Sequence, residues 1–342
     1  MADSTYMPKV YHERPGDRLV GIDGGEIRIE SGCNFFCDPG SNVSFPNPYG
    51  GLDYFVDGNA SGVTIASGLR PTFDATRGGL SWGDCFSMLS SAIAASNTSI
   101  GLTANRWWAR RNRIFCCGDR ELTEDLTVLP EKCDIIGVGY DAAVPYPIIT
   151  GTHVIAAATN GVRFINLGFY DDTGTLDMSL EGVGNAFYGC TFHPNTLGTT
   201  MSLALTGAAG LKIQNCTWLM GDISNVFGTC ISLLGASGLD QDISHNRIAG
   251  TVGILTNVSL ANTVHGSQIA NNHFRTVGYC INDASADYMI VNNTFISDAA
   301  DDASGAGGAA LVVKCNIRYA AGNRMTNDVD NNCSYPDDSE WA

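Results

Sequence analysis

A six-residue pattern of apolar and polar positions recurs through the second half of the chain. It reads apolar, any residue, small or polar, then Leu, Cys or Asn, any residue, and a large apolar residue. Seven hexamers fit it, at residues 164–169, 187–192, 213–218, 243–248, 269–274, 290–295 and 320–325. Their third positions lie 23, 26, 30, 26, 21 and 30 residues apart. Stacked short strands tolerate such uneven spacing because only the strands must keep register, so the pattern predicts a solenoid.

The fourth position of the hexamer predicts a ladder of side chains inside the coil. Four asparagines and, before them, two cysteines occupy this position: Asn246, Asn272, Asn293, Asn323, Cys190 and Cys216. Residues stacked one coil apart are about 4.8 Å from each other, so buried amides can hydrogen-bond along the column. Such a ladder satisfies buried polar groups without a ligand, whereas the alternative is that the asparagines bind one. The cysteines are interpreted as small core residues.

A second column of apolar runs precedes the hexamers and predicts a second strand in each coil. These runs lie at 201–205, 230–234, 253–257, 279–283 and 310–314, and two upstream runs lie at 114–119 and 133–141. The strand period of two is expected to turn the flanking apolar residues of each hexamer to one inward face. We therefore predict an all-β fold, a right-handed parallel β-helix of about nine coils over residues 114–326.

The ends of a solenoid need cover, since exposed strand edges invite aggregation. Residues 81–96 predict a short amphipathic capping helix, with Ser81 or Asp84 as its N-cap, in a lead-in over residues 53–113. Residues 1–52 are proline-rich and are expected to dock on or oligomerise with another chain, with a disordered tail as the alternative. Residues 327–342 are expected to form a polar C-terminal tail.

The charge balance excludes some classes of partner. Lys and Arg total 19 against 35 Asp and Glu, a net charge of −16. Nucleic-acid binding depends on Lys and Arg neutralising phosphates, so we expect no nucleic-acid partner. An anionic membrane surface would be repelled, and the sequence contains neither a run of eighteen apolar residues nor a secretory signal. We expect that the chain does not insert into a membrane and that it is synthesised in the cytoplasm.

The cysteines indicate neither a disulfide framework nor a metal centre. Twelve are scattered through the chain, and no two are separated by two residues as in common zinc sites. Reduced thiols are therefore expected. No metal and no cofactor is predicted.

Two segments resemble known phage proteins. GLDYFVDGNASG (51–62) followed by GGLSWGDCFSMLSSAIAAS (78–96) resembles the start of pectate-lyase-like β-helix proteins of bacteriophages, where a similar strand and capping helix precede the coil. Residues 24–43 resemble repeats of phage virion and decoration proteins. The resemblance implies a homotrimer mounted on a capsid or tail by its N-terminus, and hence a location on the virion. The Arg-Pro-Lys pattern of pectate lyases and the polygalacturonase motif series are both absent.

An enzymatic role would depend on acidic residues. A glycosidase needs two carboxylates about 5–9.5 Å apart. The candidates after the first hexamer are Asp171, Asp172, Asp177 and Glu181, and a second group follows the sixth hexamer, at Asp298, Asp301 and Asp302. The groups are five coils apart, about 24 Å, so they cannot form one catalytic pair within a chain.

Three hypotheses follow. The first is a structural, non-enzymatic virion protein: a trimeric spike, fibre or decoration subunit held on capsid or tail proteins through residues 1–52. The second is a tailspike-type enzyme, a hydrolase or lyase that degrades host polysaccharide with the first acidic group. The third is a non-catalytic protein that binds a host surface glycan or receptor.

Overall fold

The chain divides into two units, Met1–Ser41 and Asn42–Ala342. The computed structural model describes residues 10–13, 18–21, 50–58, 79–80, 85–100, 111–117, 121–127, 131–141, 144–145, 147–151, 153–155, 160–171, 176–178, 183–194, 202–206, 210–219, 227–234, 240–256, 267–276, 280–283, 289–297, 303–305, 312–314, 317–319 and 333–335. In the first unit, β1 (Val10–Glu13) pairs antiparallel with β2 (Arg18–Gly21).

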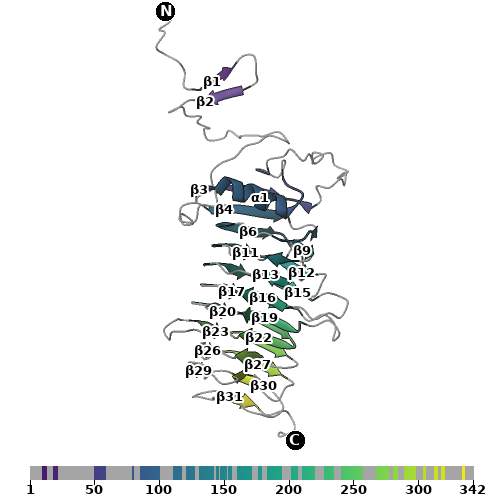
Figure 1. Cartoon of the computed structure of the whole chain (residues 1–342), viewed down its shortest axis with the longest axis vertical. Helices are drawn as coiled ribbons and strands as arrows, with labels where there is room; N and C mark the ends of the chain where they lie inside the picture. The colour runs from purple at the N-terminus through teal and green to yellow at the C-terminus, as the bar shows by residue number, and fades with distance from the viewer. Residues whose placement is uncertain are drawn as a thin grey trace, which may run out of the picture. The chain divides into compact units, whose positions relative to one another are not determined.

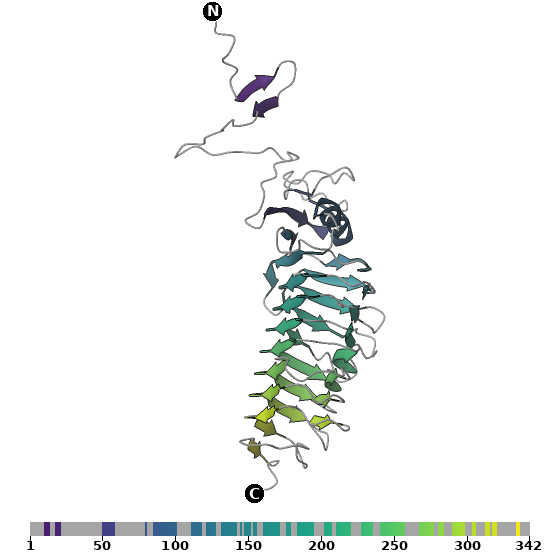
Figure 2. The same ribbon diagram turned by 60° about the vertical axis from the view of Figure 1, so that its left-hand side comes forward.

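The second unit is a parallel β-helix, which confirms the predicted fold class (Figures 1 and 2). Each complete turn passes through three parallel sheets. The ten strands of the first sheet are β3 (Gly50–Val56), β4 (Arg111–Cys117), β6 (Cys133–Val138), β11 (Arg163–Ile165), β14 (Ala186–Tyr188), β17 (Lys212–Gln214), β20 (Asp242–Ser244), β23 (Gln268–Ala270), β26 (Met289–Val291) and β29 (Val312–Lys314).

The other two sheets complete each turn. The ten strands of the second sheet are β5 (Leu122–Thr123), β9 (Ile148–Gly151), β12 (Gly168–Asp171), β15 (Thr191–His193), β18 (Thr217–Trp218), β21 (Arg247–Gly250), β24 (His273–Thr276), β27 (Thr294–Ser297), β30 (Ile317–Tyr319) and β31 (Cys333–Tyr335). The seven strands of the third are β10 (Val154–Ile155), β13 (Leu176–Met178), β16 (Ser202–Thr206), β19 (Thr229–Leu234), β22 (Val252–Thr256), β25 (Ile281–Asp283) and β28 (Ala303–Gly305). A small antiparallel pair joins β7 (Tyr140–Asp141) to β8 (Val144–Pro145).

Each hexamer is a corner between two strands, not a single strand as the sequence suggested. In the first copy β11 ends at Ile165, Asn166 and Leu167 turn the chain, and β12 begins at Gly168. The third position has positive φ in six copies: Asn166, Gly189, Asn215, His245, Asn271 and Asn292. Asparagine and glycine enter the left-handed region at low cost, which explains the small or polar preference there. The bend, rather than strand alternation, turns both end residues of the hexamer inward.

The inward residues form continuous aromatic stacks. The ring centroids of Phe164 and Phe187 are 5.0 Å apart, and those of Phe192 and Trp218 are 4.7 Å apart. All four side chains are buried. Each ring removes about 150–250 Å² from water, so these stacks make a large contribution to the stability of the coil.

The seventh hexamer was assigned to the wrong residues. β29 pairs with β26 so that Val313 lies opposite Ile290, and β30 pairs with β27 so that Ile317 lies opposite Thr294. This rung therefore belongs to residues 312–319 and not to 320–325. The run at 310–314 also feeds the first sheet rather than the second predicted column, whose other members lie in the third sheet.

A helix covers the first rung, but it begins later than predicted. α1 spans Leu89–Ile100 instead of 81–96, and Ser81 and Asp84 lie outside the described residues. The backbone N–H groups of Leu89 and Ser90 donate to the carboxylate of Glu124, at 2.6 and 2.8 Å. A buried carboxylate from a later rung thus caps the helix and complements its dipole. The expected boundary at 52/53 falls inside β3, which pairs with β4.

No helix in the described part of the chain is long and apolar enough to cross a membrane.

Candidate functional site

The predicted asparagines line the corner between the first and second sheets. Asn246 donates its side-chain N–H to Asn272 Oδ1 at 3.0 Å, and Asn272 donates to Asn293 Oδ1 at 3.0 Å. Each amide also donates to a carbonyl of the preceding rung, that of Ile213 in the case of Asn246. All three are buried and satisfy one another, so they leave little hydrogen-bonding capacity for a ligand. Asn323 lies outside the described residues.

The two cysteines continue this column toward the N-terminus. Cys190 and Cys216 are buried, and the backbone N–H of Cys216 donates to Asn246 Oδ1 at 2.8 Å. The Cys190 thiol lies 3.5 Å from the carbonyl oxygen of Phe164. Burial raises the pKa of Cys216 well above its ordinary value. This thiol is therefore protonated at neutral pH, unlike a nucleophilic cysteine.

The acidic group proposed for catalysis is divided between two sheets. Asp171 ends β12 in the second sheet, opposite Gly151, and Asp177 lies in β13 of the third sheet, opposite Val154. Asp172 and Glu181 lie outside the described residues. Across the segments that the structure describes, no three His, Cys, Asp or Glu side chains are grouped to hold a metal.

Charges on the outer face of the first sheet alternate in sign along the coil axis. The register places Asp53, Arg113, Asp134 and Arg163 on four successive strands. Arg113 donates to both carboxylate oxygens of Asp53 at 2.8 and 2.6 Å. Arg163 donates to both oxygens of Asp134 at 2.6 and 2.5 Å, and Arg111 also contacts Asp134. This charge column neutralises itself.

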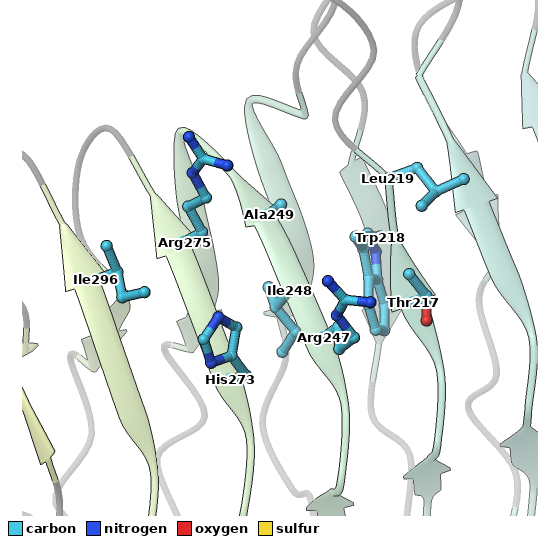
Figure 3. Close-up of a pocket in the computed structure, with 9 residues that line it drawn as sticks. All are labelled: Thr217, Trp218, Leu219, Arg247, Ile248, Ala249, His273, Arg275 and Ile296. Atoms are coloured by element: carbon cyan, nitrogen blue, oxygen red, sulfur yellow. The ribbon is translucent and has the colours of Figure 1, made fainter.

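The outer face of the second sheet carries cations without such partners. Arg247, His273 and Arg275 are exposed, and they form no ion pair with any side chain in the described segments. Arg247 lies directly opposite His273 in the pairing of β21 with β24, and Arg275 is two residues further along the same face. Figure 3 shows these side chains on neighbouring strands.

The two arginines and the histidine, called here the cation cluster after Arg247 and Arg275, border a depression of about 440 Å³. Ala249 lies opposite Arg275, and its small side chain leaves room between the larger neighbours. Leu219 and Ile296 line the two ends of the depression, and Thr217 lies opposite Arg247 (Figure 3). The site is thus an open trough that combines apolar surface with positive charge.

A histidine with an altered titration lies on the same face, toward the N-terminus. His193 follows Tyr170 in the outer column of β12 and β15, and their ring centroids are 4.2 Å apart. Burial lowers the pKa of His193 to about 4. Its Nε2 is buried and has no hydrogen-bond partner among the residues that the structure describes. His193 is therefore neutral at pH 7 and adds no charge to the cation cluster.

Sequence reasoning missed the cation cluster although the hexamer alignment contains it. The fifth hexamer position begins each second-sheet strand and points outward, and Arg247 and His273 occupy it in consecutive copies. The prediction looked for catalytic residues on the coil among acidic side chains, because those are the residues that glycosidases use. Two adjacent cations at an outward position were the available signal.

Comparisons with known proteins leave the family open. No protein-family model matches the chain, and no curated protein sequence matches it. A solved structure of PfbA, a surface adhesin of Streptococcus pneumoniae, is similar at 12% identity and a TM-score of 0.32. The alignment covers 72% of this chain and 87% of PfbA. At this level of similarity the adhesin carries no argument about function.

Proposed function

We propose that the protein is a structural, non-catalytic subunit of a bacteriophage particle, a trimeric β-helical spike, fibre or decoration protein. The observation that carries this proposal is the division of the chain into a small hairpin-containing unit, Met1–Ser41, and a long coil. The N-terminal unit would hold the protein on the capsid or tail. The coil would project from the particle surface.

An apolar stripe on the first sheet supports self-association. Five half-buried side chains occupy one outward column on consecutive strands: Phe55, Phe115, Ile136, Ile165 and Tyr188. The strand residue before each of them is buried, and so is the residue after Phe55, Phe115 and Ile136. Outward apolar residues in an unbroken column are a common feature of protein interfaces.

The charge column beside the stripe favours contact between identical copies. Association of chains that each carry −16 is opposed by mutual repulsion. On this face Arg113 and Arg163 already neutralise Asp53 and Asp134. Copies that meet here would bring together a surface with little local net charge.

Native mass spectrometry of the full chain tests the oligomeric part of the proposal, and three chains are expected. Ile136→Asp combined with Ile165→Asp is expected to yield monomers with an unchanged circular dichroism spectrum. Val291→Asp is the matched control, because Val291 occupies the same outward column beyond the stripe. A wild-type monomer would rule out the trimer, and dissociation by Val291→Asp would show that the stripe is not the specific interface.

Particle association is tested with phage carrying this gene. Purified particles are expected to contain the full chain, detected by mass spectrometry, in a fixed ratio to the major capsid protein. A chain lacking residues 1–41, supplied in its place, is expected to fold but to be absent from the particles. If the full chain is missing from washed particles, the virion role is wrong.

A further inference from the structure

The cation cluster has an arrangement that an isolated sheet would not favour. Arg247 and Arg275 are diagonal neighbours on one face of adjacent strands, and His273 lies directly opposite Arg247. Like charges that are neighbours across adjacent strands are destabilising. Elsewhere on the coil the described arginines of the first sheet each have a carboxylate partner. The second sheet therefore has a local excess of positive charge in a chain whose net charge is −16.

The shape of the site limits what can neutralise that excess. The depression of about 440 Å³ lies within the range of small-ligand sites, and Leu219, Ala249 and Ile296 give it apolar surface. A polyphosphate chain requires a longer row of cations and would be repelled by the remaining surface. A sugar ring with a carboxylate matches the combination, because its apolar face can pack on aliphatic groups. Its carboxylate can accept paired hydrogen bonds from arginine.

We propose that the cation cluster binds a carboxylate-bearing sugar of an acidic glycan. Arg247 and Arg275 hold the carboxylate, and Leu219 and Ala249, which are neighbours on adjacent rungs, pack against the ring. This inference deepens the proposed function by giving the coil a recognition site. Glycan binding at this site requires neither association with a particle nor a trimer, and each of these is measured by its own experiment described above.

The test is binding of the full-length protein to an array of uronate- and sialate-containing oligosaccharides, each printed beside its carboxyl-reduced form, followed by calorimetry with the best ligand. At least one acidic oligosaccharide is expected to bind more tightly than its reduced form. Arg247→Gln and Arg275→Gln are each expected to weaken binding about tenfold or more, since each removes charge-assisted hydrogen bonds.

Lys212→Gln is the matched control. Lys212 is an exposed cation on the outer face of the first sheet, so its replacement removes the same charge and is expected to leave affinity within about twofold. An equal loss in this variant would mean diffuse attraction and would overturn the assigned site. The proposal also fails if no carboxylated glycan is preferred over its reduced form by the folded protein. It fails equally if Arg247→Gln converts a native oligomer to monomers, since the face would then contact another copy.

Discussion

The outer faces of the first and second sheets hold their charges in opposite ways. On the first sheet, Asp134 lies between Arg113 and Arg163 in register, so each charge meets its opposite. On the second sheet, Arg247 lies opposite His273 and has a second arginine, Arg275, as its diagonal neighbour. In a parallel stack the neighbours of a side chain are fixed by coil register, so the order of charges along the axis sets the local field. An alternating order stabilises the fold by itself, whereas a like-charged order depends on salt or a ligand.

The largest loss of stability is expected at the asparagine ladder in the corner between these two sheets. Changes on the two outer faces can be compared with that loss. Asn272→Ala is expected to lower the free energy of unfolding by about 3–5 kcal/mol, because it removes the acceptor of the buried Asn246 backbone N–H, one of the two acceptors of the Asn246 side-chain amide, and a donor to the Ile243 carbonyl. Urea denaturation measures the change. Asn271→Gly, in the adjacent left-handed position, is expected to cost less than about 1 kcal/mol. Equal losses in the two variants would mean that the amide ladder is not what stabilises the corner.

Substitutions in the charge column are expected to cause the next largest loss of stability. Asp134→Asn is expected to cost about 2–3 kcal/mol, because the carboxylate side chain is only 5% exposed and contacts both Arg111 and Arg163. Asp53→Asn, at 24% exposure, should cost about 1 kcal/mol or less. Urea midpoints of both variants in low salt are the measurement. A cost for Asp134→Asn no larger than that for Asp53→Asn would remove the contrast between buried and exposed parts of the column.

The pH dependence of stability should report on His193, which lies on the outer face of the second sheet. The pKa of His193 is about 4 in the folded protein against an ordinary value of 6.5, so between these values the unfolded chain binds the proton and the folded chain does not. Stability from this group is complete above about pH 6.5 and falls as pH drops toward 4, by about 2 kcal/mol at pH 5.

His193→Phe is expected to lose less stability than the wild type between pH 7.5 and pH 5, measured by urea denaturation. A non-titrating residue on the same outer face provides the control, since Thr217→Val should keep the wild-type pH dependence. If His193→Phe follows the wild-type curve, another group causes the acid sensitivity.

The smallest effect on stability is expected from a substitution that makes charges alternate in sign on the outer face of the second sheet. His273→Glu places a carboxylate opposite Arg247 and beside Arg275, and it is expected to stabilise the coil by about 0.5 kcal/mol in low salt. The gain should disappear in 1 M NaCl, because exposed pairs are screened. Thermal unfolding at both salt concentrations measures it. A loss of stability would mean that the native cations are not in mutual repulsion.

The repeat alone was enough to predict the coil, because apolar residues and asparagines recur at the corner in copy after copy. The geometry of that corner was not predicted, because a six-residue apolar pattern fits a strand as well as a bend until the left-handed residue, Asn166 in the first copy, is recognised. The seventh hexamer matched the template by chance. Only its pairing partners, β26 and β27, show that residues 312–319 fill that rung.

Nonlocal contacts account for most of the remaining differences. The start of α1 depends on Glu124, which lies 35 residues beyond Leu89 and gives no signal in the helical segment itself. The candidate site was missed for a different reason: its members, Arg247 and Arg275, lie in different coils and become neighbours only through the strand register. A column-by-column reading of the aligned hexamers would have paired Arg247 with His273, and Arg275 lies one residue beyond its hexamer.

The corner between the first and second sheets also bears on which changes in chain length the coil can accept. Two residues form this corner in the six rungs from β11–β12 to β26–β27, as Asn166 and Leu167 do between β11 and β12, whereas the earlier rung holds residues 139–147, with the β7–β8 pair, between β6 and β9. The other connections differ widely: Thr251 alone joins β21 to β22, whereas residues 219–228 join β18 to β19. From β11 onward, differences in chain length between rungs therefore fall on the other two edges of the coil and not on this one. Surface loops on those two edges can change in length without disturbing the register of the corner.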